Sequence, residues 1–337
     1  MTASSMQYSK AFNRTISREI NSVGSFCKYT DDIQRVLFSL KEGSEILLLE
    51  SSGGLGDVLA ATSVIKGLAE RYKNIAIVLV TKKSAFPLLQ NNPYLRQFFS
   101  FSPGMDTFDY LLSFDVSFVC SEWESRAFPI INKTRAEILW DYFELPGNCC
   151  KPIYCVTEQE KEEANLFLES KKLKNKKLVG ITLRSAALYK DYPIQKYREV
   201  VSLLQEKKDI HFLIFDETLP VFWPYKNYTN VCNQALRDVA ALLEKCNCLI
   251  TVDSGLLHLA IAVGTKLIFL YGISSLRART HFVEAINITT DGLDCVPCWR
   301  GDRFKCKRDE ENSDSIFSSC ITAIEPQKIV EAINVLV

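Results

Sequence analysis

The sequence predicts an α/β protein in which two domains repeat the same strand–turn–helix–strand architecture. Short apolar and β-branched runs alternate with helical patterns along most of the chain, an order typical of parallel sheets covered by helices. Three of these runs end in a turn of glycines or polar residues just before a helix. A length of 337 residues also exceeds what one hydrophobic core usually serves, which favours two domains.

The chain divides into three segments. Residues 1–40 are polar with apolar positions at roughly helical spacing, and we interpret them as an accessory helix that packs on the body or on another subunit. The charged stretch 157–177 is typical of a solvated helix face followed by a linker. We therefore expect a first Rossmann-like domain over 41–160 and a second over 161–337, each with a phosphate-sized turn, facing a shared cleft.

The first domain opens with one βαβ unit. A buried strand over 45–50 enters a glycine-rich turn, and a helix over 58–72 and a strand over 75–81 follow. The glycines do not have the G-x-G-x-x-G spacing of dinucleotide-binding turns, but they allow a ligand or another backbone to approach closely. The glycines of this turn are Gly53, Gly54 and Gly56.

A second βαβ unit opens the second domain, with strands over 178–183 and 210–215 and a helix over 194–206. The turn after the first of these strands carries Arg184 and Lys190. Two cations at this position suit a diphosphate. Ordinary surface charge accounts for them equally well.

The stretch 249–271 gives the most informative turn. An apolar strand ends at Asp253-Ser254-Gly255, a buried helix with His258 in its first turns runs to Val263, and a strand follows from Lys266. The start of such a helix presents unpaired backbone N–H groups at the carboxyl end of a strand, where α/β sheets bind anions. The alternative is an ordinary crossover whose helix is capped by the serine.

Composition excludes several classes of function. Forty basic and forty acidic residues cancel, which argues against bulk attraction to nucleic acid. We find neither a transmembrane segment nor the apolar core of a signal peptide, and therefore expect a cytoplasmic protein. The twelve cysteines are then expected to be thiols or metal ligands rather than disulfides.

Asp57 is the candidate general base. It stands where the glycine-rich turn enters its helix, and a carboxylate there could accept a proton from an attacking hydroxyl. The alternative is a helix N-terminal carboxylate that stabilises the free N–H groups by about 1 kcal/mol.

Four cysteines have the spacing of a metal site. A Cys-x-x-Cys pair and two further cysteines within about 25 residues fit a tetrahedral four-thiolate site for iron or zinc. Four protein ligands leave no open position for substrate, so we expect a structural metal. The alternative is four unrelated thiols. The candidate ligands are Cys295, Cys298, Cys306 and Cys320.

Together these motifs resemble glycosyltransferase family 9, the ADP-heptose heptosyltransferases, over about residues 44–337. The resemblance rests on the sequence around Asp57, the Asn92-Pro93-Tyr94 segment, and three later blocks. These blocks are Leu236-x-Asp238-Val239-Ala240-Ala241-Leu242-Leu243, Asp253-Ser254-Gly255-x-x-His258-Leu259-Ala260, and Cys295-x-Pro297-Cys298 with a late cysteine before a terminal helix.

The resemblance implies a GT-B fold and an inverting transfer of heptose from ADP-heptose that needs no catalytic metal. Asp57 would deprotonate the acceptor hydroxyl, and Lys190, with Arg184 as a possible second cation, would neutralise the departing diphosphate. The remaining donor contacts implied are Asp253, Ser254, Gly255 and His258 at the diphosphate and sugar, and Asp216 and Glu217 at the nucleotide ribose.

The cysteine spacing looks more like the iron-binding motif of the bacterial autotransporter heptosyltransferases, which modify serines on a protein. This likeness favours a protein acceptor and structural iron, with zinc as the alternative metal. Two alternatives stay open for the activity: a lipopolysaccharide-core acceptor, and a protein that binds the sugar nucleotide without turnover. A homo-oligomer is compatible with either acceptor.

Overall fold

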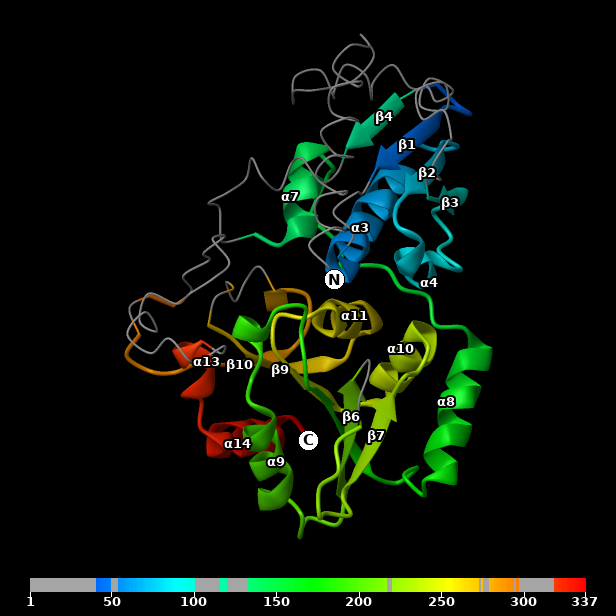
Figure 1. Cartoon of the computed structure of the whole chain (residues 1–337). Coiled ribbons are helices and arrows are strands. Elements are labelled where there is room, and N and C mark those ends of the chain that lie inside the picture. The colour runs from blue at the N-terminus through cyan, green and yellow to red at the C-terminus, as the bar shows by residue number, and fades with distance from the viewer. Residues whose placement is uncertain are drawn as a thin grey trace. The chain divides into compact units, whose positions relative to one another are not determined.

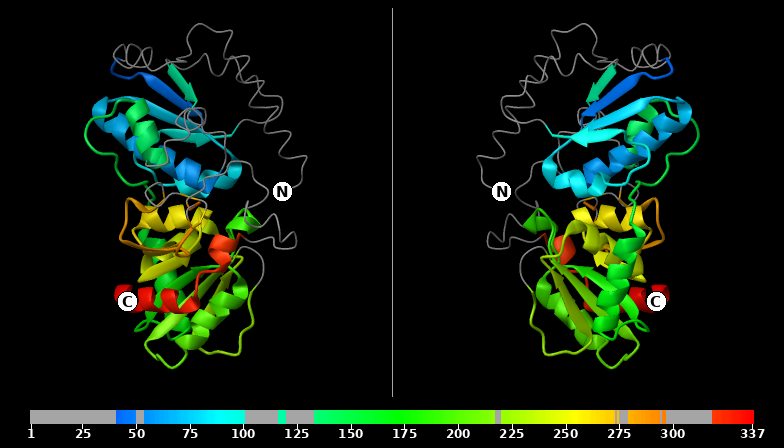
Figure 2. Two further views of the ribbon diagram at one scale, coloured as in Figure 1. Left: turned by 90° about the vertical axis from the view of Figure 1, so that its left-hand side faces the viewer. Right: turned by 90° about the vertical axis from the view of Figure 1, so that its right-hand side faces the viewer.

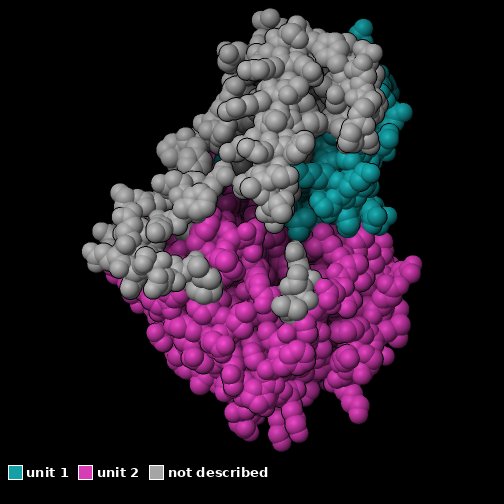
Figure 3. Space-filling view, viewed as in Figure 1, with its two compact units in different colours: residues 1–128, 135–150 teal, residues 129–134, 151–337 magenta. Residues whose placement is uncertain are grey.

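A computed structural model of the chain describes residues 41–49, 54–100, 116–119, 133–216, 220–272, 274, 279–293, 295–296 and 318–337. The described residues within Met1–Phe128 and Arg135–Cys150 form one compact unit, and those within Pro129–Thr134 and Lys151–Val337 form another (Figure 3). The extension 1–40, Gly53, Glu217, Cys298 and Cys306 lie outside the described residues.

The first unit contains a parallel four-stranded sheet in the order β3-β2-β1-β4 (Figure 1). Buried side chains such as Ile46, Ile77 and Leu79 explain why these apolar runs form strands. The strands are β1 (Glu45–Leu49), β2 (Ala76–Val80), β3 (Gln97–Phe99) and β4 (Val116–Val119), and the helices are α3 (Leu55–Arg71), η1 (Lys83–Ala85), α4 (Phe86–Leu89) and α7 (Arg135–Tyr142).

Helix α3 follows β1 and packs against α7. An acidic residue in its first turn, Asp57, and a basic residue in its last turn, Arg71, complement the helix dipole. The two helices approach closely at Gly67, where a Cβ atom would lie 2.6 Å from side-chain atoms of Trp140 and Leu145. This contact fixes α7 relative to α3.

The second unit contains a parallel six-stranded sheet in the order β10-β9-β8-β5-β6-β7. From β5 the chain continues to β6 and β7 on one side, and from β8 it continues to β9 and β10 on the other. The neighbouring strands β5 and β8 therefore mark the topological switch point of the sheet. Open α/β sheets bind their ligands at this point. The strands are β5 (Lys177–Thr182), β6 (Ile210–Asp216), β7 (Tyr228–Cys232), β8 (Cys248–Thr251), β9 (Lys266–Leu270) and β10 (Ala285–Ile288).

Helices cover both faces of this second sheet (Figures 1 and 2). Helix α14 packs on α9, and α10 packs on α8 and α11. The core that α9 and α14 cover contains three fully buried aromatic side chains, those of Tyr192, Tyr197 and Phe212. The helices are α8 (Glu158–Ser170), η2 (Leu188–Lys190), α9 (Ile194–Leu203), α10 (Leu236–Lys245), α11 (Gly255–Val263), α13 (Ser319–Thr322) and α14 (Pro326–Leu336).

The expected α/β architecture with parallel sheets is confirmed, and the element ends differ by a few residues. Helix α3 begins at Leu55 rather than at residue 58, because Gly54 is the extended N-cap and accepts the first helical hydrogen bonds. Helix α9 ends at Leu203, three residues before the expected end. The charged stretch from 157 forms α8, which a capping box between Thr157 and Glu160 begins.

Candidate functional site

The candidate base Asp57 is held in place from two sides within the first unit. Its Oδ1 is in an ion pair with the Nη1 of Arg135 at the start of α7. Its Oδ2 lies where a side chain on Gly54 would stand, 2.7 Å from an ideal Cβ position. The Asp57 side chain is 31% exposed and that of Arg135 is 6% exposed. Asp57 is thus an oriented carboxylate that remains partly open to solvent.

Arg135 is a residue that sequence reasoning missed. It belongs to no motif, and its pairing with Asp57 depends on how α7 packs against α3. The only available signal was an arginine at the start of an amphipathic helical pattern. A buried arginine is rare unless it is paired.

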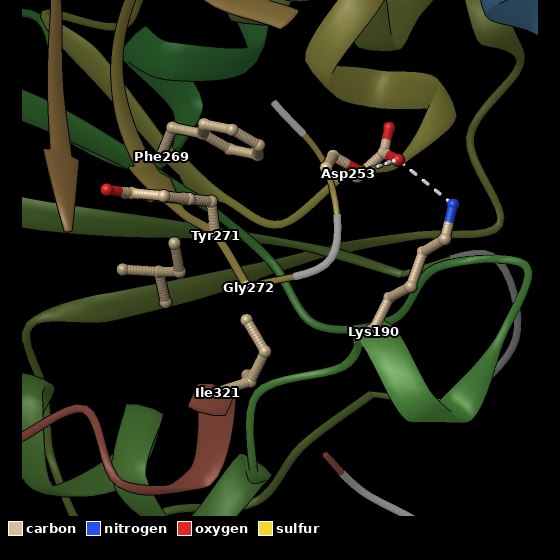
Figure 4. A pocket seen from close by; sticks show the side chains of 8 residues that line it. Lys190, Asp253, Phe269, Tyr271, Gly272 and Ile321 are labelled. Atoms are coloured by element: carbon tan, nitrogen blue, oxygen red, sulfur yellow. Dashed lines mark hydrogen bonds and ion pairs between the residues drawn. The ribbon is translucent and has the colours of Figure 1, made fainter. Parts of the chain in front are cut away.

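The switch point of the second sheet brings together Lys190, on the connection after β5, and Asp253, on the connection after β8. Lys190 Nζ lies 3.0 Å from Asp253 Oδ2 (Figure 4). Arg279 Nε lies 2.9 Å from Asp253 Oδ1, and the Ser274 hydroxyl donates to Oδ2. His258 Nε2 lies 4.0 Å from Oδ1. Four side chains thus surround one carboxylate.

Asp253 is a buried carboxylate in a strongly positive setting. Burial by itself would raise its pKa, but the charges of Arg279, Lys190 and His258 and the hydrogen bond from Ser274 hold the pKa well below its usual range. Asp253 is therefore ionised over the whole physiological pH range and draws the cations to one point.

The turn that carries Lys190 is fixed by partly buried hydrogen bonds. The Ser185 N–H donates to Asp191 Oδ1 over 2.7 Å, and the Ser318 hydroxyl donates to the Tyr189 carbonyl over 2.7 Å. Burial raises the pKa of Asp191. These contacts place Lys190 before any ligand arrives.

Helix α11 begins at this same edge of the sheet. The Ser254 hydroxyl accepts from the Leu257 N–H over 3.3 Å and thus caps the helix that starts at Gly255. Gly264 ends it with a φ of +89°, a left-handed conformation that favours glycine. His258, in the first turns, is 23% exposed.

Arg184 and Asp216 are paired with each other. The Arg184 Nη1 donates to Asp216 Oδ2, and the two side chains are 37% and 2% exposed. The pair joins the end of β6 to the turn after β5, so both residues lie at the carboxyl edge of the second sheet, as the sequence predicts.

A small pocket opens beside the Asp253 cluster (Figure 4). Its volume is about 10 Å³, which is room for about one water molecule. It therefore does not enclose a ligand by itself. The polar lining residues are Lys190, Asp253 and Ser274, and the others are Phe269, Leu270, Tyr271, Gly272 and Ile321.

Of the four candidate metal ligands, the structure describes Cys295, which is exposed, and Cys320, which is buried. The Cys320 Sγ occupies the space that a Cβ on Gly272 would fill, 2.2 Å away. Among the residues that the structure describes, no group of three or more His, Cys, Asp or Glu is arranged to hold a metal. Thiol sulfurs suit iron and zinc, and the room made by Gly272 is compatible with a fixed ligand at Cys320.

Arg279 and Ser274 are the other site residues that sequence reasoning missed. Both follow β9 in a polar stretch without helical or strand periodicity, and neither belongs to a motif. An arginine near the carboxyl end of a parallel strand was the only signal.

The profile of glycosyltransferase family 9 (heptosyltransferase) matches residues 126–307, more than half of the chain. The chain belongs to this family. It is therefore a glycosyltransferase of the heptosyltransferase type. A comparison with curated protein sequences gives no match.

Solved structures of this family have the same fold. A family 9 glycosyltransferase from Veillonella parvula DSM 2008 has a TM-score of 0.68 at 16% identity, covering 88% of this chain and 98% of its own. ADP-heptose lps heptosyltransferase II of E. coli has a TM-score of 0.63 at 18% identity, covering 87% and 98%.

A third similar structure is the iron-containing dodecameric glycosyltransferase TibC from enterotoxigenic E. coli H10407, with a TM-score of 0.65 at 15% identity, covering 88% of this chain and 80% of its own. These similarities confirm the GT-B-type α/β fold with parallel sheets. In the part of the chain that the structure describes, none of the helices combines the length and apolar character needed to span a membrane.

Proposed function

We propose that this enzyme transfers heptose from ADP-heptose to an acceptor hydroxyl with inversion at the anomeric carbon. The observation that carries the proposal is the cluster of cations around Asp253 at the switch point of the second sheet, beside the N-terminus of α11. Such a cluster suits the diphosphate of a nucleotide sugar. Support for the sugar comes from family membership and from the TibC structure in complex with ADP-D-β-D-heptose.

In the proposed reaction Asp57 accepts the proton of the acceptor hydroxyl, and the oxygen of that hydroxyl forms a bond to the anomeric carbon of the heptose. The bond between that carbon and the diphosphate oxygen breaks, and ADP leaves with the electron pair. Lys190 and the α11 N-terminus stabilise the charge that develops on the diphosphate. No catalytic metal is assigned a role.

The other donor contacts follow from their positions. Ser254, Gly255 and His258 lie at the start of α11, beside Asp253, and are proposed to hold the diphosphate and the sugar. The Arg184–Asp216 pair, with Glu217 next in sequence, is proposed to lie at the nucleotide.

We propose a serine of an autotransporter protein as the acceptor and a structural iron, or alternatively zinc, held by the four cysteines. The cysteine spacing and the similarity to the iron-containing TibC support both proposals, and its dodecameric state supports a homo-oligomer. The similarity to lps heptosyltransferase II supports the alternative acceptor, a lipopolysaccharide core sugar.

The test is to incubate the protein with ADP-heptose and each candidate acceptor and to detect a heptose adduct by mass spectrometry. Asp57→Asn should abolish transfer while ADP binding persists. Glu70→Gln is the matched control, because it removes an exposed carboxylate from the same helix and should keep full activity. A wild-type protein that binds ADP-heptose but modifies no acceptor would favour the binding-protein alternative, and transfer by Asp57→Asn at the wild-type rate would exclude Asp57 as the base.

A further inference from the structure

Both oxygens of the Asp253 carboxylate are used by groups from separate segments of the second unit. Oδ1 faces Arg279, which follows β9, and His258 on α11. Oδ2 faces Lys190, on the turn after β5, and Ser274. One side chain thus determines where groups from three chain segments meet.

The charges of this cluster favour an anion even though a carboxylate lies at its centre. Two permanent cations, Lys190 and Arg279, outnumber the one carboxylate before His258 is considered. The Asp253 side chain is 11% exposed, whereas those of Lys190 and Arg279 are 27% and 15% exposed. Of the three side chains, that of Lys190 is the most accessible to an approaching diphosphate. Arg279 is also the residue type suited to this task, because a guanidinium is a planar fork of N–H donors that matches the oxygens of a phosphate.

We infer that Asp253 is a positioning residue that acts through the cations, and that Arg279 is a second ligand of the donor diphosphate beside Lys190. The inference rests on the proposed function insofar as the diphosphate is that of a nucleotide sugar. In this role Asp253 holds Lys190 and Arg279 in place and does not itself bind the sugar.

The effect of Asp253→Asn on ADP affinity distinguishes these two roles by its sign. If Asp253 were only a negative charge near an anion site, or only a ligand of the sugar, its neutralisation would leave ADP binding unchanged or make it tighter. If it holds the cations, neutralisation weakens ADP binding, although a repulsive charge is removed. We expect the Kd for ADP, measured by titration calorimetry, to rise about tenfold or more in Asp253→Asn and in Arg279→Gln.

Two further variants separate this mechanism from a general loss of structure. Lys266→Gln removes one positive charge at the opposite, amino end of β9, where Lys266 pairs with exposed Glu284, and should leave ADP affinity unchanged. In the double variant Lys190→Gln/Arg279→Gln, the addition of Asp253→Asn should cause no further loss, because the groups through which Asp253 acts are gone. A merely structural role would give the same loss in both backgrounds.

Unchanged or tighter ADP binding in Asp253→Asn would overturn the positioning role, and unchanged binding in Arg279→Gln would overturn the ligand role. A wild-type protein that binds neither ADP nor inorganic pyrophosphate would overturn both. Failure of the proposed function is a separate result: wild-type protein would bind ADP in an Arg279-dependent way but transfer no heptose to any acceptor. Thermal unfolding of each variant shows that it is folded.

Discussion

At the scale of single residues, Gly54 is needed for the space it leaves to Asp57. Its φ of −76° is open to any residue, so the requirement is steric. A Cβ there would stand 2.7 Å from the Asp57 Oδ2 and would push the carboxylate aside. Because a displacement of about 1 Å at a catalytic group can cost about 100-fold in rate, we expect Gly54→Ala to lower kcat by about that factor.

Gly54→Ala should also lower the free energy of unfolding, because the displaced carboxylate is the ion-pair partner of the buried Arg135. Thermal unfolding and single-turnover transfer assays check the two effects separately. Wild-type kcat in this variant would show that the position of the Asp57 carboxylate does not limit the reaction.

His211 makes a pH-dependent contribution to stability. It is buried in β6, and its Nε2 lies 2.9 Å from the Thr229 hydroxyl oxygen. Burial, with a smaller effect of Lys176, lowers its pKa from 6.5 to about 4. The unfolded chain therefore binds the proton more tightly, so stability is full above pH 6.5 and falls as the pH decreases toward 4.

We expect the titration of His211 to lower the free energy of unfolding at pH 5 by about 2 kcal/mol relative to its value above pH 6.5. His211→Gln keeps a hydrogen-bonding group without a titrating ring, so its unfolding free energy should fall less between pH 7 and pH 5 than that of the wild type. Urea unfolding at several pH values in this window measures the difference. Parallel curves for the two proteins would contradict the assignment.

At the scale of elements, an ion pair joins α8 to α10. Arg237 contacts Glu160 through Nε and Nη2, and Nη2 also donates to the Cys155 carbonyl over 2.6 Å. The hydrogen bond from Arg237 is the main reason that the pKa of Glu160 is lowered to about 2. Both side chains are largely buried, so removing one partner leaves the other charge buried without its counter-ion and costs more than it does at the surface.

We expect Arg237→Gln to lower the free energy of unfolding by about 2–3 kcal/mol at pH 7. The exposed pair Lys174–Glu169 gives the control, because solvent screens this pair and Lys174→Gln should cost much less. The effect of Arg237→Gln should decrease below pH 4.5, where the unfolded chain begins to protonate Glu160. Equal losses in the two variants by urea unfolding would show that α8 is not anchored by this pair.

The elements were predictable from sequence to the extent that each rests on a local pattern. The strand that ends at Thr251 and the stop of α11 at Gly264 follow from an apolar run and from a glycine that adopts positive φ. The pairing of Asp57 with Arg135 and of Asp253 with Arg279 could not be predicted, because each depends on how separate segments pack. Sequence patterns identify a group that needs a partner, whereas the fold determines which partner it receives.

At the scale of the whole molecule, the formal net charge is zero, with forty residues of each sign. An anion site in such a chain must be local, and the site that we propose lies at one edge of the second sheet, beside the connections after β5 and β8. Neutral composition and a strongly positive site are therefore compatible.

A metal bound by the four cysteines should stabilise the second unit, because it would link Cys320, which lies against Gly272, to cysteines earlier in the chain. We expect about one equivalent of iron or zinc per chain by elemental analysis, and less in Cys320→Ser. Loss of the metal should lower the Tm and reduce solubility or assembly before it affects chemistry. Cys149→Ser removes a half-buried thiol outside the motif and should retain the metal. Less than about half an equivalent in the wild type, with all four thiols reacting freely, would exclude the site.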